Sequence, residues 1–182
     1  MSDQFVEQAK ANMSALERLI KGLPGISGYV DKELRRDADK RLRELIASQL
    51  TEQKLQLLTM QKQLLGSGGL RWLAEIEQVI QKLQTLTDRI RTASYGYAGL
   101  FDAVKIGETQ LAALHQFDTE LATRVATMGE VVTRLQAAVT NHETLQPVLQ
   151  EITQTVSELD TLFNRRRDAL LSPESLQNSS SV

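Results

Sequence analysis

The chain has 182 residues, with no cysteine, two histidines and a formal net charge of −2. Without cysteine it has no disulfide framework, thiolate zinc site or cysteine nucleophile, and two histidines are too few for most histidine-ligated metal or haem sites. The near-neutral charge argues against a general nucleic-acid binder, which usually carries a basic excess.

Glycine and proline divide the chain into five predicted helices. The breaks fall at 22–28, 66–69, 95–99 and 141–147, because glycine and proline disfavour helix interiors by about 1 and 3 kcal/mol. Between the breaks almost every residue is a good helix former, which predicts helices at about 3–21, 28–65, 69–93, 106–141 and 144–171. The polar, serine-rich end at 172–182 predicts a disordered tail.

The first predicted helix is short and amphipathic. It lacks the basic start and the continuous apolar run of a signal peptide, and no stretch of the chain reaches the roughly 20 apolar residues of a membrane span. We therefore expect a soluble, cytoplasmic protein. The helix is predicted to pack on its own bundle, and the alternative is that it lies on a membrane surface. Its apolar residues are Phe5, Ala9, Met13, Leu16, Leu19 and Ile20.

The last three predicted helices carry apolar residues at alternating steps of three and four, which is the seam of a left-handed coiled coil. In 69–93 the seam is Trp72, Ile76, Val79, Leu83, Leu86, Ile90 and Ala93. In 106–141 it is Leu111, Leu114, Asp118, Leu121, Val125, Met128, Val132, Leu135, Val139 and His142. In 144–171 it is Leu145, Leu149, Ile152, Val156, Leu159, Phe163, Arg166 and Leu170.

The segment 28–65 is less regular. Its apolar stripe shifts in phase between Ile46 and Leu50, which is typical of a stutter or a change of packing partner. Short connections at 66–69 and 141–147 favour antiparallel neighbours. The prediction is an all-α protein, an elongated antiparallel four-helix bundle with a short extra N-terminal helix, in a single domain at 1–171.

The two halves of the chain differ in charge. Residues 1–91 hold 15 Lys and Arg against 12 Asp and Glu, whereas residues 92–182 hold 6 against 11. The two hairpins therefore carry opposite net charges. They either attract one another weakly, or the asymmetry is a chance property of solvated faces.

Unusual residues are predicted to gather at one end of the bundle. If 66–69 and 141–147 share one end, then 22–37, 93–108 and 163–170 meet at the other. That end collects more than half of the aromatic residues and a dense set of charges of both signs. As surface residues they form ion pairs. As a polar layer inside the bundle they fix the register of the helices, and the same layer is a candidate floor for a binding site. The candidate cluster is Tyr29, Arg35, Arg36, Asp37, Asp39, Tyr95, Tyr97, Phe101, Asp102, Lys105, Asp118 and Arg166.

Two of these charges occupy seam positions. Asp118 and Arg166 fall at similar heights in an antiparallel hairpin, and a buried charge without a partner costs several kcal/mol. We predict that Asp118 or Asp102 pairs with Arg166 or Arg36.

Motifs for chemistry are scarce. A di-iron bundle needs Glu-x-x-His pairs, which neither His115 nor His142 supplies. His115 is expected at the surface, and His142 as a cap or seam residue that ends a helix. Glu33 and Asp37, with Asp39, have the spacing to hold a divalent ion, but the surrounding basic residues favour salt bridges. Arg41, Arg43, Lys54 and Lys62 form at most an interrupted basic stripe. No catalytic residue, cofactor or metal is therefore predicted.

Two segments resemble a known family. They are Gly25-Ile-Ser-Gly-Tyr-Val-Asp-Lys-Glu-Leu-Arg-Arg-Asp-Ala-Asp-Lys-Arg-Leu-Arg43 and Ser94-Tyr-Gly-Tyr-Ala-Gly-Leu-Phe-Asp-Ala-Val-Lys-Ile106. They are similar to segments of a family of bacterial all-helical proteins encoded near SPFH (band-7, stomatin-like) membrane-scaffold proteins. The resemblance implies a bacterial cytoplasmic protein, an accessory of a membrane-associated assembly. It carries no site residues to this chain.

Three functions remain open at this stage. The first is a non-enzymatic helical-bundle adaptor or scaffold that acts through protein contacts. The second is a peripheral membrane protein that self-assembles on anionic lipid, and the third is a metal- or ligand-binding enzyme at the polar end. A protein partner is expected, a homo-oligomer and a membrane surface are further options, and a nucleic-acid partner is not expected.

Overall fold

The computed structural model describes residues 32–93 and 108–171, and within them the side chains of 40–93, 116–141 and 143–166. These residues form only helices, so the predicted all-α class is confirmed. The predicted helix at 3–21 and the tail at 172–182 lie outside the described residues. The elements are α2 (Lys32–Gly66), the 3-10 helix η1 (Leu70–Trp72), α3 (Leu73–Thr92), α5 (Glu108–Ala138) and α6 (His142–Leu171).

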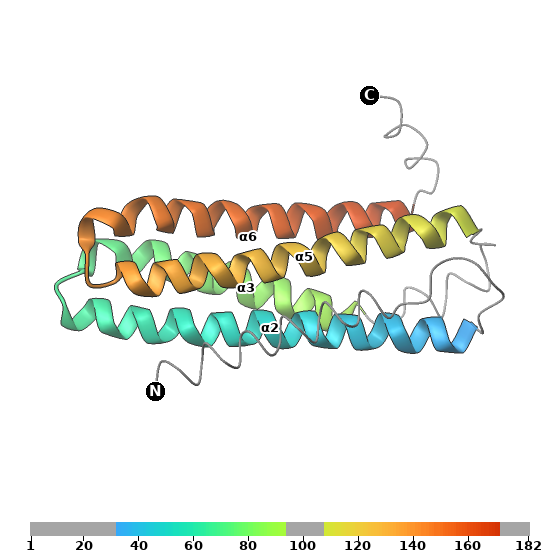
Figure 1. Ribbon diagram of the computed structural model, residues 1–182, viewed down its shortest axis with the longest axis horizontal. Coiled ribbons are helices and arrows are strands. Elements are labelled where there is room, and N and C mark those ends of the chain that lie inside the picture. Colours follow the sequence, from blue (N-terminus) through green and yellow to red (C-terminus); the bar gives the residue numbers. More distant parts are fainter. Residues whose placement is uncertain (1–31, 94–107, 172–182) are drawn as a thin grey trace, which may run out of the picture.

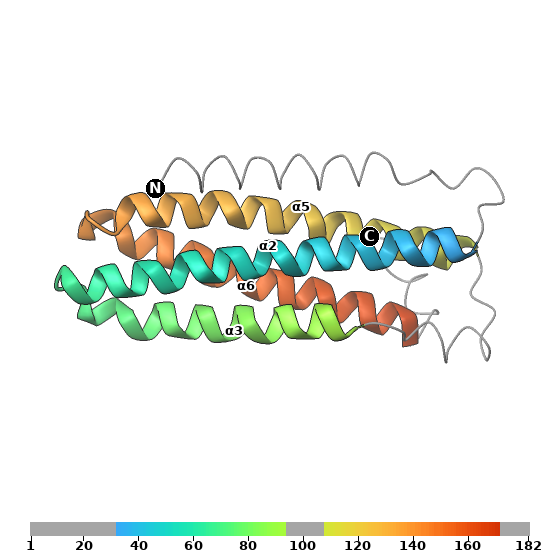
Figure 2. The same cartoon turned by 90° about the horizontal axis from the view of Figure 1, so that it is seen from below.

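The four α-helices pack side by side as an elongated bundle (Figures 1 and 2). At 1.5 Å per residue, the 35 residues of α2 span roughly 52 Å. Helices α2 and α3 form one antiparallel hairpin, and α5 and α6 form the other. The predicted four-helix bundle and the antiparallel pairing within each hairpin are confirmed.

The hairpins pack with parallel helices next to one another. Helix α2 lies beside α5, and α3 lies beside α6. Trp72 near the start of α3 contacts Gln146 near the start of α6, and Arg89 near the end of α3 contacts Asp160 further along α6. The chain directions in Figure 1 agree. Helices α3 and α5 therefore occupy diagonally opposite corners, whereas a simple up-and-down bundle would place these consecutive helices side by side.

A glycine turn closes the first hairpin. Ser67 N–H donates to Gln63 O at 3.1 Å and Gly69 N–H to Leu64 O at 2.9 Å, so the turn takes up the last carbonyls of α2. Gly68 has φ +81°, a left-handed conformation that favours glycine. A Cβ on Gly69 would lie 2.5 Å from Leu64 Cδ2, so this position also requires glycine. The turn leads through η1, and the predicted helix at 69–93 therefore begins with a 3-10 turn.

The second hairpin turns earlier than predicted. Helix α5 ends at Ala138, and Asn141 caps α6 because its Oδ1 accepts a hydrogen bond from Glu143 N–H at 3.2 Å. His142 is the first residue of α6, so the expectation that it ends the preceding helix is wrong. Pro147 lies in the second turn of α6. Because proline has no N–H, the helix lacks the hydrogen bond that this position would donate to Glu143 O.

The core runs along the whole described bundle. The predicted seams of 69–93, 106–141 and 144–171 are buried wherever the structure describes their side chains, except that Ala93 is partly buried. Since apolar burial contributes about 25 cal/mol per Å2, this continuous core is the main source of stability. The largest fully buried side chains are Leu42, Ile46, Leu50, Leu57, Met60, Leu64, Ile76, Leu83, Leu86, Ile90 and Leu121.

Candidate functional site

A buried ion pair joins α5 to α6. Arg166 Nε donates to Asp118 Oδ1, and Arg166 Nη2 donates to Asp118 Oδ2 at 3.1 Å. The two side chains are 5% and 7% exposed. Both are seam residues, and the bidentate geometry pairs each charge with its opposite in a site that water hardly reaches. The predicted pairing of Asp118 with Arg166 is confirmed.

A second polar group braces the two hairpins at the same end. Arg89 of α3 donates through Nη1 to Asp160 Oδ1 and through Nη2 to Asn164 Oδ1, at 2.5 Å for the latter. Its guanidinium carbon also lies 5.1 Å from the ring centroid of Phe163. The contact joins the basic α2–α3 hairpin to the acidic α5–α6 hairpin. It is one instance of the complementarity that the charge asymmetry suggested.

Arg43 does not belong to an exposed basic stripe. It is 9% exposed, and its Nη1 donates to Ala93 O, at the C-terminal cap of α3, at 2.6 Å. A cation there complements the partial negative charge of the helix end. The residue thus ties the start of the described core in α2 to the end of α3.

Most of the predicted cluster lies outside the described side chains. The ends of α3 and α6 and the starts of α2 and α5 do lie at one end of the bundle, as predicted (Figure 1). Asp118 and Arg166 are brought together there. Arg35, Arg36, Asp37 and Asp39 belong to α2, but their side chains are outside the described set. The other members of the cluster lie outside the described residues; they are Tyr29, Tyr95, Tyr97, Phe101, Asp102 and Lys105.

Sequence reasoning missed a polar position in the core of α2. Gln53 is 7% exposed and fills the seam position between Leu50 and Leu57. Its Nε2 donates to Val125 O of α5 at 2.9 Å. A Cβ on Gly129 would lie 3.2 Å from that nitrogen, so the glycine in the middle of α5 lets the glutamine reach the backbone. The phase shift in the apolar stripe of 28–65 was the feature of the sequence that could have indicated this buried polar residue.

An open groove runs between α2 and α3 on the outer surface. Its volume is about 490 Å3, and it is lined by Lys54, Leu58, Ile80, Gln81, Gln84 and Thr85. Leu58 and Ile80 form its apolar part, and Lys54 is the one ionised side chain that lines it. Lys54 Nζ donates across the groove to Gln84 Oε1, and Gln84 Nε2 donates to Asp88 Oδ2 at 2.6 Å.

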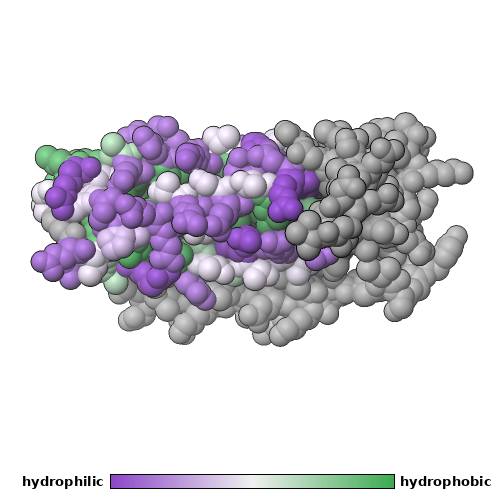
Figure 3. Space-filling view, turned by 90° about the horizontal axis from the view of Figure 1, so that it is seen from above, coloured by the Kyte–Doolittle hydropathy of each residue, from purple (hydrophilic) through white to green (hydrophobic). Residues whose placement is uncertain are grey.

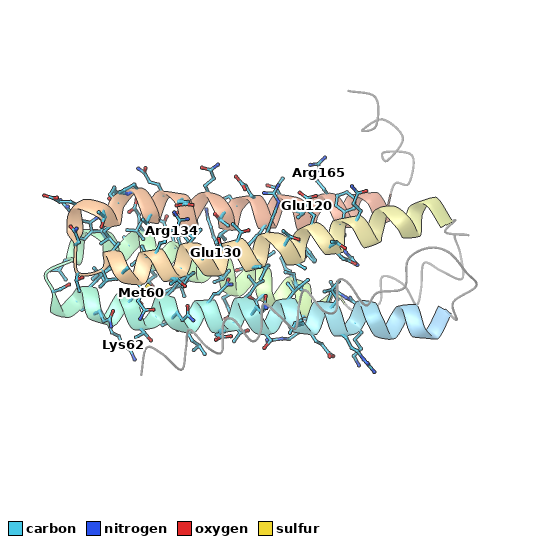
Figure 4. All side chains as sticks on the ribbon, in the orientation of Figure 1. Met60, Lys62, Glu120, Glu130, Arg134 and Arg165 are labelled. Atoms are coloured by element: carbon cyan, nitrogen blue, oxygen red, sulfur yellow. The ribbon has the colours of Figure 1, made fainter. Side chains whose placement is uncertain are left out.

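Two further arginines of the α5–α6 hairpin pair with glutamates on its surface. Arg124 bonds Glu120 and Glu158 at 3.1 and 2.9 Å, and Arg134 bonds Glu151 at 2.5 Å. These side chains are about half exposed, and such pairs contribute at most about 1 kcal/mol. In Figure 4, Arg165 and Lys62 point away from the bundle on opposite sides. They are solvated charges and not parts of a common site.

Within the part of the chain that the structure describes, no group of three or more His, Asp or Glu side chains is placed to hold a metal ion. The candidate ion ligands Glu33, Asp37 and Asp39 lie outside the described side chains, as do His115 and His142. In the same part of the chain, no helix is both long enough and apolar enough to span a membrane.

No protein-family model, curated protein or solved structure matches the chain. The resemblance of 25–43 and 94–106 to the family encoded near SPFH proteins therefore remains an expectation.

Proposed function

We propose that the protein is a non-enzymatic adaptor that binds a partner protein through the groove between α2 and α3. The observation that carries the proposal is the apolar floor of this groove on an otherwise polar flank. Leu58 and Ile80 are only partly buried, and Leu55, one turn before Leu58, is 56% exposed. Leu58 and Ile80 in the groove, with the exposed Leu55 nearby on α2, offer a partner apolar area to bury.

The occupant that fits this groove is an amphipathic helix of a protein partner. A groove between two antiparallel helices accepts the apolar residues of a third helix at steps of three and four. Because Lys54 is the only ionised side chain in the lining, the polar edge of that helix should carry an acidic residue opposite it. A cytoplasmic accessory of a membrane-associated assembly is consistent with this mode of action.

The polar core groups support a structural role for the bundle interior. Asp118 and Arg166 satisfy one another, and Gln53 reaches a backbone carbonyl. These contacts bind helix to helix. The surface of the rod is then the part left to act on other molecules.

Pull-down from native lysate tests the proposal. We expect the wild type to recover a partner that Leu55→Glu/Leu58→Glu loses by about tenfold or more, since two buried leucines contribute several kcal/mol to a contact. The matched control is Leu65→Glu, a leucine with the same 56% exposure at the end of α2. It should keep the partner.

The recovered partner is then purified and mixed with the wild type. A one-to-one complex that Leu55→Glu/Leu58→Glu abolishes supports the adaptor function. Equal recovery by the wild type and both variants contradicts it. If the groove variant instead splits a homo-oligomer, the groove is a contact between copies of this chain and the adaptor proposal is wrong.

A further inference from the structure

Exposed leucines concentrate at the glycine-turn end of the bundle. Among the described side chains, the exposed large hydrophobic residues are Leu55, Leu65 and Leu70. Leu65 and Leu70 are 56% and 64% exposed, and they flank the same turn, 66–69. Hydrophobic surface also reaches this end of the rod in Figure 3, where the flank is mostly hydrophilic. These two exposed leucines on either side of the hairpin turn are hereafter called the leucine tip.

The leucine tip is rigidly supported. The turn is held by hydrogen bonds from Ser67 and Gly69 to the end of α2. Two residues after Leu70, Trp72 is buried, and its indole N–H donates to Gln146 Oε1 of α6 at 2.9 Å. The Arg71 guanidinium carbon lies 3.9 Å from the Trp72 ring centroid. The turn that carries the two leucines is therefore tied to α2 and α6 by hydrogen bonds.

The charge around the leucine tip is mainly basic. Lys62 lies one turn before the glycine turn, and Arg71 follows Leu70 directly; both are exposed. In the neighbouring turn between α5 and α6, Thr140 and Asn141 are uncharged, and Glu143 is the exposed acid. Glu75 is partly buried and contacts Gln146 Nε2 at 3.4 Å. Along the chain, two exposed cations thus lie within three residues of the two exposed leucines.

This combination matches the surface of an anionic bilayer. Exposed apolar side chains at the end of a rod can enter the acyl boundary of a bilayer. Lysine and arginine beside them can meet lipid phosphates. Contact between the tips of two copies would bring Lys62 and Arg71 against their own equivalents, and like charges disfavour it.

We propose that the glycine-turn end of the bundle docks on anionic lipid bilayers. Leu65 and Leu70 insert at the interface, Lys62 and Arg71 contact lipid phosphates, and the rod projects from the membrane. This lipid contact lies on a different surface from the α2–α3 groove and does not depend on the adaptor function.

Vesicle flotation with the full-length chain tests the proposal. The wild type should float with vesicles of phosphatidylcholine and phosphatidylglycerol, and much less with phosphatidylcholine alone. Binding should fall as salt rises, because salt screens the basic contacts. Leu65→Ser/Leu70→Ser should lower binding by about tenfold or more, since inserted leucine side chains supply the apolar part of the affinity. Lys62→Gln/Arg71→Gln should lower binding to the anionic vesicles by a similar factor.

Leu55→Ser is the matched control, because Leu55 has the exposure of Leu65 but lies on the flank. It should float as the wild type does. Thermal melts followed by circular dichroism should show that all three variants fold, since the substituted side chains are exposed.

The proposal is overturned if the wild type does not float, or if Leu65→Ser/Leu70→Ser floats equally well. It is also overturned if the tip variant abolishes a dimer seen by light scattering while wild-type lipid binding is absent. Loss of lipid binding by the tip variant with an intact partner pull-down separates this proposal from the adaptor function.

Discussion

At the scale of single residues, buried polar side chains join the helices at defined heights. Asp118 and Arg166 form a bidentate pair among leucines, and Gln53 reaches Val125 O past Gly129. An apolar seam alone tolerates sliding of one helix along another, because leucines exchange places at similar free energy. A charge pair does not, since any slip leaves a buried charge without its partner. We therefore expect these residues to favour one register of α6 and α2 against α5.

The ion pair makes the first prediction. Asp118→Ala should lower the free energy of unfolding by about 3–5 kcal/mol, because it leaves the Arg166 guanidinium buried without its carboxylate. Asp118→Leu/Arg166→Met should be close to the wild type in stability, since both charges are removed together. Urea unfolding measures both. A double variant as unstable as Asp118→Ala would contradict the prediction.

The second prediction concerns the contact of Gln53 with α5. In a Gln53→Ala background, Gly129→Ala should stabilise the protein by about 1 kcal/mol, the helix-propensity gain. In the wild type the gain should be smaller, because the new Cβ lies 3.2 Å from Gln53 Nε2. Urea unfolding of the four proteins gives the coupling free energy. A coupling free energy of zero would contradict the prediction, because the contact of Gln53 would then not depend on a glycine at position 129.

At the scale of elements, the two hairpins end in different ways. The turn at 66–69 uses glycine to reach conformations that other residues resist, whereas Asn141 caps the start of α6 with its side chain. The first turn exposes Leu65 and Leu70, and the second exposes polar residues. The ends of the hairpins thus differ in chemistry although they lie at the same end of the bundle.

The glycine turn makes the third prediction. Gly69→Ala should lower the free energy of unfolding by about 1–3 kcal/mol, because its Cβ would overlap the Leu64 side chain and overpack a buried site. Gly66→Ala is the control, since a Cβ there meets nothing within 4 Å. It should leave the melting temperature unchanged or raise it. Thermal unfolding of the two variants checks the difference, and equal melting temperatures would contradict it.

At the scale of the whole molecule, the hairpins pack with parallel neighbours. This arrangement places α3 beside α6 and diagonally across from α5. It also brings the basic hairpin against the acidic one, through Arg89 and Asp160. The groove between α2 and α3 lies on one flank, and the leucine tip lies at one end.

The absence of native cysteine allows the topology to be tested by crosslinking. Glu75→Cys/Gln146→Cys should crosslink with a short bifunctional reagent, because Gln146 Nε2 lies 3.4 Å from the Glu75 carboxylate. Glu75→Cys/Gln136→Cys places the second cysteine on α5 at the same end and should not. The reverse result would mean that α3 and α5 are neighbours, as in a simple up-and-down bundle.

The sequence by itself determined the helices of the described residues and their two hairpins, and it limited the buried ion pair to Asp118 or Asp102 with Arg166 or Arg36; the structure selected Asp118 and Arg166. Periodic leucines and valines specify which face of each helix is buried, and a charge on that face requires an opposite charge at the same height. The sequence also indicated a phase shift in the apolar stripe of α2, although it did not show that Gln53 fills the buried position between Leu50 and Leu57.

Only the tertiary structure decided how the hairpins pack and where Arg43, Leu65 and Leu70 lie. A seam is satisfied equally by a parallel or an antiparallel neighbour, so the pattern along the chain contains no information on the choice. Arg43 resembles its exposed basic neighbours until the end of α3 is placed beside it. Leu65 follows the seam residue Leu64, and only the direction in which the turn leaves α2 shows that Leu65 is left in solvent. The exposure of a side chain depends on neighbours that are far apart in the sequence, and only tertiary packing brings those neighbours together.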